Sequence, residues 1–271
     1  MPILNINGTS LFYEVQGRGT PLIFIHSHGL SHEMFFPQIR YFRNKYKIIL
    51  VDLRGNGQSG GLTISNQEIL KCQAKDLKLL LDYLDIPHAV LIGVADGGVL
   101  VQKFSYLYPD RVSAIILSDS YCNNTTKGLL GKMSSALQAA SWITYYLPGE
   151  LFLRSLKLVY YRWDIAYSTL RNETLRKRPG GWIKQRIALS NIDYSSYLPN
   201  IKVPALCMVG DFCSAGISRM QETAERIPNA SFRLIEDSFD PSNLCQPKQF
   251  NEIVLSFLEE NVDQIEPTLV I

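Results

Sequence analysis

The chain has 271 residues, of which 46% are hydrophobic and 19% are charged, and its formal net charge is +2. This size suits one large core with an inserted subdomain, and the nearly balanced charge with no basic arm argues against nucleic acid as a partner. No run reaches the roughly 18 apolar residues of a membrane span, and the N-terminus lacks the features of a secretory signal, so we expect a cytoplasmic protein that does not bind membranes.

The five cysteines show no CxxC spacing, and all four histidines precede residue 89. An odd number of scattered cysteines suggests neither a disulfide framework nor a zinc site, and four histidines are too few for a histidine-rich metal site. We therefore expect neither a metal nor another cofactor.

Short apolar runs that alternate with amphipathic segments predict a largely parallel sheet covered by helices on both faces. The predicted strands are Ile3–Ile6, Leu11–Val15, Leu22–His26, Tyr46–Asp52, Ala89–Val94, Val112–Ser118, Ala205–Gly210 and Ser231–Glu236. A helix is expected over about 66–84, beginning with Ser65-x-x-Glu68, the pattern of a capping box. A final helix is expected over about 249–259.

The pattern changes between the sixth and seventh strands, where residues 122–199 show no strand–helix alternation. We predict a helical cap there and a core domain formed by residues 1–121 and 200–271. The cap holds all three tryptophans, and its eleven lysines and arginines against four acidic residues give it a formal charge of +7. It is either a small helical subdomain with a solvated basic face or a lid over a hydrophobic pocket that attracts an anionic ligand.

A glycine-flanked turn, Gly93-Val94-Ala95-Asp96-Gly97-Gly98, joins the fifth strand to an amphipathic helix. A strand, a sharp turn and a helix make a nucleophile elbow, which exposes the central side chain of the turn. That central residue is Ala95, so the elbow presents a methyl group where a nucleophile is expected.

Six motifs, in this order, resemble the α/β-hydrolase superfamily, and its capped branch of esterases, enol-lactone hydrolases and cofactor-free haloperoxidases in particular. They are residues 25–29 (IHSHG), 52–59 (DLRGNGQS), 93–98 (GVADGG), 108–112 (YPDRV), 210–213 (GDFC) and 237–240 (DSFD) followed by 243–247 (NLCQP). The resemblance covers nearly the whole chain. It implies an α/β-hydrolase fold in which an eight-stranded, mostly parallel sheet is flanked by helices, with a helical cap after strand six.

By the same resemblance, the serine, acid and histidine positions of the family's catalytic triad are Ala95, Cys213 and Asp240. None of these residues suits the family's mechanism, in which a serine attacks a carbonyl, a histidine takes its proton and a carboxylate orients the histidine. The resemblance also assigns the backbone N–H groups of His28 and Asp96 to an oxyanion hole, which side-chain replacement does not remove.

The side chains that could carry proton chemistry are few. His28 is the obvious base that titrates near neutral pH, or else a loop residue turned away from the pocket. Asp96 is either a pocket carboxylate or a favourable charge at a helix N-terminus. Asp119 occupies the alternative acid position of relatives that resemble haloalkane dehalogenases, and Asp240 either acts in the pocket or caps a turn. Cys213 is either a packed small hydrophobe or a nucleophile.

Three functions remain open. The first is a rewired, non-hydrolytic enzyme of the lyase, isomerase, decarboxylase or cyclase type, acting on a small hydrophobic carbonyl compound in specialised metabolism. The second is a non-catalytic pseudo-hydrolase that binds a small ligand or a protein partner, and the third is a residual esterase or lactonase. The expected partner is a small hydrophobic molecule, anionic if the basic cap contributes, and a homodimer is left open. The residues expected to line the pocket are Ser27, Leu30, Tyr121, Trp142 and Trp163.

Overall fold

Eight strands form one sheet in the computed structural model, which describes residues 2–125, 149–176 and 179–263. The strands are β1 (Ile3–Ile6), β2 (Thr9–Gln16), β3 (Pro21–Ile25), β4 (Lys47–Val51), β5 (Ala89–Val94), β6 (Val112–Ser118), β7 (Ala205–Gly210) and β8 (Ala230–Ile235). Their order is β1-β2-β4-β3-β5-β6-β7-β8; the pairs β1–β2 and β2–β4 are antiparallel and the other pairs parallel. The expected mostly parallel sheet is confirmed, and each strand ends within two residues of its predicted limits.

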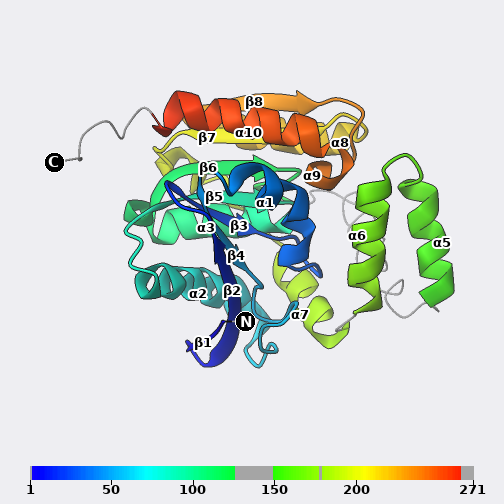
Figure 1. Ribbon diagram of the computed structural model, residues 1–271, viewed down its shortest axis with the longest axis horizontal. Helices are drawn as coiled ribbons and strands as arrows, with labels where there is room; N and C mark the ends of the chain where they lie inside the picture. The colour runs from blue at the N-terminus through cyan, green and yellow to red at the C-terminus, as the bar shows by residue number, and fades with distance from the viewer. Residues whose placement is uncertain (1, 126–148, 177–178, 264–271) are drawn as a thin grey trace.

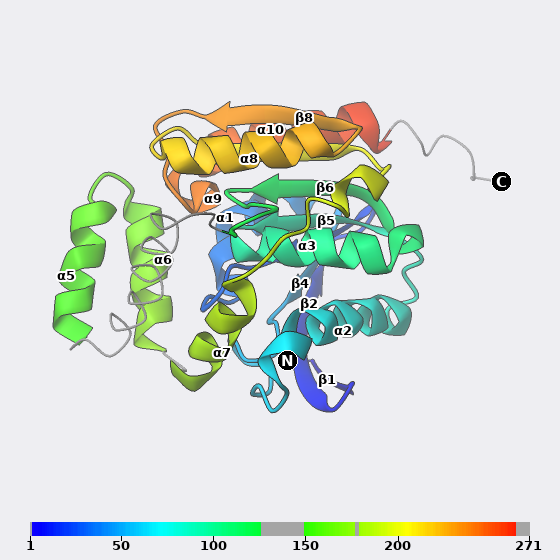
Figure 2. The same ribbon diagram turned by 180° about the vertical axis from the view of Figure 1, so that it is seen from behind.

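Helices cover both faces of this sheet. The α-helices are α1 (Phe36–Phe42), α2 (Ile69–Tyr83), α3 (Asp96–Leu107), α5 (Gly149–Val159), α6 (Asp164–Leu175), α7 (Pro179–Leu189), α8 (Ser214–Arg226), α9 (Ser242–Cys245) and α10 (Pro247–Asn261). Short 3-10 turns are η1 (His32–Phe35), η2 (Asn66–Glu68), η3 (Pro109–Arg111) and η5 (Leu198–Asn200). Helices α2, α3 and α8 lie on one face of the sheet, and α1 and α10 lie on the other (Figures 1 and 2). In the described ranges, no helix combines the length and the apolar character needed to cross a membrane.

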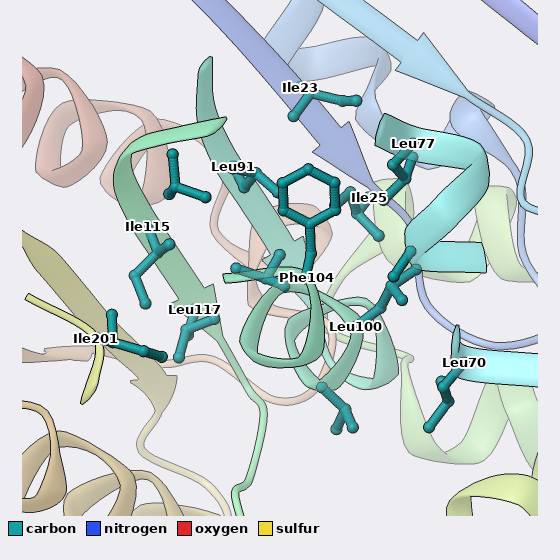
Figure 3. Packing of buried hydrophobic residues seen from close by; sticks show 14 of the residues in the cluster. Ile23, Ile25, Leu70, Leu77, Leu91, Leu100, Phe104, Ile115, Leu117 and Ile201 are labelled. Atoms are coloured by element: carbon teal, nitrogen blue, oxygen red, sulfur yellow. The ribbon is translucent and has the colours of Figure 1, made fainter. Parts of the chain in front are cut away.

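The central strands are apolar along their whole length because both of their faces are covered. Every residue of β5 and of β7 is buried. On the face under α2 and α3, Leu91 of β5 packs in one cluster with Phe104 of α3 and Leu77 of α2 (Figure 3). This packing fixes α3, and therefore the turn that precedes it, against the sheet.

The predicted capping box at residue 65 is wrong. The Ser65 side chain makes no capping hydrogen bond. The Ser65 carbonyl instead accepts a hydrogen bond from the N–H of Glu68, which closes the 3-10 turn η2 ahead of α2. A tight turn therefore replaces the first turn of the predicted helix, because the backbone carbonyl takes the bond that the hydroxyl was expected to make.

Helices α5, α6 and α7 come between β6 and β7 in the chain, where the cap was predicted. Helices α5 and α6 stand beyond one end of the sheet, next to α9 (Figure 1). Residues 126–148 and 177–178 of the predicted cap lie outside the described residues. The division into a core and a cap at residues 122 and 199 stays a prediction.

Candidate active site

The candidate residues follow strands whose carboxyl ends meet at one edge of the sheet. Strands β3, β5, β6, β7 and β8 run parallel, so the loops after them lie side by side. Ligands bind at this edge in open α/β sheets. The edge carries the loop with His28, the elbow at Ala95, Asp119, and the loops with Cys213 and Asp240.

The elbow has the backbone of a nucleophile turn around a methyl group. Ala95 has φ 49° and ψ −117°, in a region that side chains rarely adopt, and its N–H donates to the carbonyl of Ser118 at 2.8 Å. A Cβ on Gly97 would lie 2.2 Å from the carbonyl oxygen of Ile25, so glycine is required there. The Ala95 methyl belongs to a buried apolar cluster with Trp163. The turn is therefore fully formed, and what it presents is an apolar contact.

His26 holds the loop after β3. Its Nδ1 lies 2.8 Å from the carbonyl oxygen of Ser27, and its Nε2 accepts a hydrogen bond from the N–H of Leu53 at 2.9 Å. Nδ1 therefore carries the proton of a neutral imidazole, and burial lowers the pKa of this histidine. His26 is committed to connecting two loops.

The His28 imidazole is not a base that titrates near neutral pH. Burial is the largest cause that lowers its pKa to about 3, and the positive charge of Arg186 comes next. Both ring nitrogens are buried, and neither has a hydrogen-bond partner among the described residues. The ring lies 6.3 Å from the ring of Trp182, measured between centroids. The structure therefore does not join this imidazole to the candidate aspartates.

The Asp96 carboxylate is held by two donors. The Tyr121 hydroxyl donates to its Oδ1 at 3.1 Å, and the backbone N–H of His28 also donates to it. Burial raises the pKa of Asp96, and the bond from Tyr121 is the largest opposing effect. One of the two N–H groups assigned to the oxyanion hole thus faces a carboxylate, and the oxyanion hole itself stays a prediction.

The Asp119 carboxylate connects the ends of β6 and β7 to the first residue of α9. Its Oδ1 accepts from the N–H of Gly210 at 3.1 Å, and its Oδ2 accepts from the N–H of Ser242 at 2.8 Å and from the hydroxyls of Ser242 and Ser118. Burial raises the pKa of Asp119, whereas these bonds oppose the rise. With its oxygens engaged in this way, Asp119 supports the loop that carries Asp240.

The Asp240 carboxyl group has no hydrogen-bond partner in the part of the chain that the structure describes. Asp240 is an exposed residue, but desolvation by the protein atoms around its carboxyl group raises the pKa well above the usual value, and the negative charges of Asp119 and Asp96 raise it further. The structure therefore brings the three predicted aspartates within electrostatic reach of one another.

Cys213 serves as the N-cap of α8. Its Sγ accepts a hydrogen bond from the N–H of Gly216 at 3.4 Å, and the side chain is half-buried. A capping role was not among the sequence-based alternatives. The residue types would not reveal it, because cysteine is not a usual N-cap.

The predicted lining residues differ in their surroundings. Leu30 and Trp163 are buried in the cluster that contains Ala95, and Tyr121 contacts Asp96. Ser27 is half-buried and bonds His26 through its carbonyl. Trp142 lies outside the described residues.

A polar cavity of about 290 Å³ lies beside the loop after β3, and the sequence did not reveal it. Asp52 and His32 form an ion pair at its wall, with 2.8 Å between Oδ1 and Nδ1, and Glu173 of α6 and Trp182 of α7 also line it. His32 is thus paired with the first residue of the DLRGNGQS motif. Within the described residues, no group of three or more histidine, cysteine or acidic side chains is arranged to hold a metal ion.

Comparison with known proteins agrees with this architecture. A family model described as alpha/beta hydrolase fold matches residues 20–142. A curated relative, 3-oxoadipate enol-lactonase 1 of Acinetobacter baylyi, is 24% identical over 261 residues, which cover 95% of this chain and 96% of the relative. Among solved structures, an esterase from Exiguobacterium antarcticum aligns with TM-score 0.82 and 22% identity, covering 95% of this chain and 98% of the esterase. The enol-lactonase from Burkholderia xenovorans aligns with TM-score 0.77 and 21% identity, covering 95% and 100% of the two chains. The fold expected from the motifs is confirmed.

Proposed function

We propose that this chain, whose residues 20–142 match a family model described as alpha/beta hydrolase fold, is an enzyme that transfers protons on a small, uncharged, hydrophobic carbonyl compound without a serine nucleophile. The observation that carries the proposal is the state of Asp240. Its carboxyl group has no hydrogen-bond partner among the described residues, and desolvation by the surrounding protein atoms and two neighbouring aspartates raise its pKa well above the usual value, although Asp240 is an exposed residue. A carboxylic acid that keeps its proton near neutral pH is suited to general acid catalysis.

The proposed step forms an enol from a carbonyl compound. Asp240 donates its proton to the carbonyl oxygen while the Asp96 carboxylate removes a proton from the adjacent carbon. One proton leaves Asp240 and one arrives at Asp96, so the net charge of the site does not change. Tyr121, whose pKa burial raises well above its usual value, remains protonated and donates to Asp96.

The surroundings of the site favour an uncharged substrate. Three aspartates lie near the elbow, and those that are ionised would repel a negatively charged substrate. The apolar cluster of Ala95, Leu30 and Trp163 offers contact to a hydrophobic group. An anionic ligand, which the basic cap suggests, is therefore the less favoured choice at this position.

Two alternatives are each supported by one observation. A non-catalytic binding protein is supported by the bond between the His28 N–H and the Asp96 carboxylate, because this bond occupies a donor that a reacting oxygen would need. A residual hydrolase is supported by the relatives, which include an enol-lactonase and an esterase.

The experiment that tests the proposal measures deuterium uptake. The protein is incubated in D2O with a panel of small ketones, and exchange at the carbon beside the carbonyl is followed by proton NMR. We expect catalysed exchange in the wild type and a loss of about 100-fold or more in Asp240→Asn, the contribution typical of a general acid. Asp110→Asn, which makes the same change at an exposed aspartate of η3, is the matched variant, and we expect it to retain exchange.

Each outcome separates the three functions. Exchange that is undiminished in Asp240→Asn would contradict the proposal. Ketones that bind unchanged without exchange would favour the binding protein. Ester or lactone hydrolysis by the wild type, without exchange, would favour the residual hydrolase.

A further inference from the structure

The turn between α5 and α6 is fastened to the loop that carries Asp240. The Tyr160 hydroxyl donates to the backbone carbonyl of Asp240 at 2.5 Å. Three residues on, Nε1 of Trp163 donates to the carbonyl of Asp237 at 2.9 Å, and Arg162 forms an ion pair with the Asp237 carboxylate at 2.7 Å. Two carbonyls and one carboxylate of the loop after β8 are thus held by this short turn.

Aromatic packing extends the same contact to the loop after β7. The Trp163 ring lies 5.2 Å from the Phe212 ring in a T-shaped arrangement, and the guanidinium of Arg162 lies 5.1 Å from the centroid of Phe212. The Tyr160 ring lies 6.0 Å from the Phe239 ring. Trp163 is also buried against the elbow cluster that contains Ala95. The turn therefore contacts two of the loops that form the candidate site, those after β7 and β8.

The backbone contacts matter because the Asp240 carboxyl group makes no hydrogen bond to the described residues. Its position is set by the chain on either side of it. On one side Asp119 holds Ser242, two residues further along, through its N–H and its hydroxyl. On the same side Tyr160 holds the carbonyl of Asp240 itself, and on the N-terminal side Trp163 holds the carbonyl of Asp237.

We propose that Tyr160 is a positioning residue, which fixes the loop that carries Asp240 and so determines where the Asp240 carboxyl group lies relative to Asp96 and Asp119. The meaning of this role for catalysis rests on the proposed function. Trp163 supports it by anchoring the same loop at Asp237.

The charged and titratable groups that act on Asp240 come from several elements. Asp119 at the end of β6 and Asp96 of α3 raise its pKa, and the pKa values of Tyr160 and of Cys245 in α9 are raised partly by the charge of Asp240. Because burial is the largest cause of the raised Tyr160 pKa, the hydroxyl stays protonated and remains a donor at physiological pH. The Tyr160 bond is therefore unaffected when Asp240 titrates.

The test compares Tyr160→Phe with Tyr161→Phe. Tyr161 is the adjacent residue and is 71% exposed, so its variant is a matched control for the loss of one hydroxyl. The pKa of the Asp240 carboxyl is measured by carbon-13 NMR titration of the labelled protein, with Asp240→Asn identifying the resonance. Hydrogen exchange of the amides of residues 237–240 reports on the loop.

We expect Tyr160→Phe to lower the Asp240 pKa by about half to one unit, the shift that corresponds to one ordinary hydrogen bond, and to speed amide exchange in the loop. Tyr161→Phe should leave both unchanged. If Tyr160→Phe fails to fold, Trp163→Phe, which keeps an aromatic ring but loses the bond to Asp237, should produce the same changes.

An Asp240 pKa and loop exchange identical to wild type in Tyr160→Phe would overturn the positioning role. These measurements need no substrate, so they are independent of the deuterium-exchange assay. If catalysed exchange occurs, the alkaline limb of its pH profile should move with the Asp240 pKa in Tyr160→Phe, and an unmoved limb would also overturn it. Undiminished catalysis in Asp240→Asn would instead reject the proposed function and leave the contact between Tyr160 and the loop to be judged by NMR alone.

Discussion

Replacing Asp119 with asparagine should destabilise the protein because the amide cannot reproduce the acceptors of a carboxylate. One Asp119 oxygen accepts from the backbone N–H of Gly210, and the other accepts from the backbone N–H of Ser242 and from two hydroxyls. In Asp119→Asn the amide oxygen can face one of these N–H groups, so the amide nitrogen must face the other. Gly210 and Ser242 are both buried, so the deprived N–H cannot turn to water.

A buried donor without an acceptor costs about 1–3 kcal/mol, and we take about 2 kcal/mol as the expected loss of unfolding free energy. With an unfolding entropy of about 2.1 cal/mol/K per residue, a chain of 271 residues should lose about 4 °C in Tm. Urea unfolding at pH 7, followed by tryptophan fluorescence, measures the free energy. Asp110→Asn is the control, since Asp110 is exposed and has no hydrogen bond to a described side chain. Equal unfolding free energies of Asp119→Asn and the control would refute the conclusion that the Asp119 hydrogen bonds stabilise this edge of the sheet.

Two further predictions concern the loop after β3 and the elbow. The pKa of His28 is lowered to about 3 in the folded state, so the wild type should lose stability as pH falls from about 6.5 toward 3, by up to about 1.4 kcal/mol per pH unit. His28→Phe should remove that part of the slope in urea unfolding between pH 7 and pH 4, and an unchanged slope would contradict the assignment. Gly97→Ala should cost at least about 3 kcal/mol or prevent folding, because its Cβ would meet the Ile25 carbonyl at 2.2 Å. Gly61→Ala, where nothing lies within 4 Å, should unfold at the wild-type urea midpoint, and similar losses in both variants would count against the steric argument.

The fold could be predicted because its signals are local. The central strands β5 and β7 are continuous apolar runs, and the elbow is marked by glycines at positions where backbone contacts leave no room for a Cβ, as at Gly97. The site could be predicted only in part. Placing Asp96, Asp119 and Asp240 at one edge follows from strand order, since each comes after a parallel strand.

The partners of these side chains could not be predicted from the sequence. The bond from Tyr160 to Asp240 joins residues 80 positions apart, and the pair of His32 and Asp52 joins residues 20 positions apart. Nothing in the neighbouring sequence of any of these residues specifies such a bond. The lowered pKa of His28 could not be predicted either. The sequence does not distinguish an exposed histidine from a buried one, and the pKa falls only when packing removes water from the imidazole.

The bond between the His28 N–H and the Asp96 carboxylate bears on how a carbonyl compound could be activated here. If a substrate carbonyl oxygen replaced this carboxylate, the N–H would exchange an ionised acceptor for a neutral one. A hydrogen bond to an ionised acceptor is about twice as strong as one between neutral groups, so this exchange is unfavourable. Activation through this N–H is therefore opposed by the protein's own side chain. A proton donor without a competing partner faces no such opposition, and among the three aspartates Asp240 is the one whose carboxyl group has no hydrogen-bond partner in the described ranges. The methyl group at Ala95 and the occupation of the N–H by Asp96 therefore both fit the proposal that a proton from Asp240 activates the carbonyl compound.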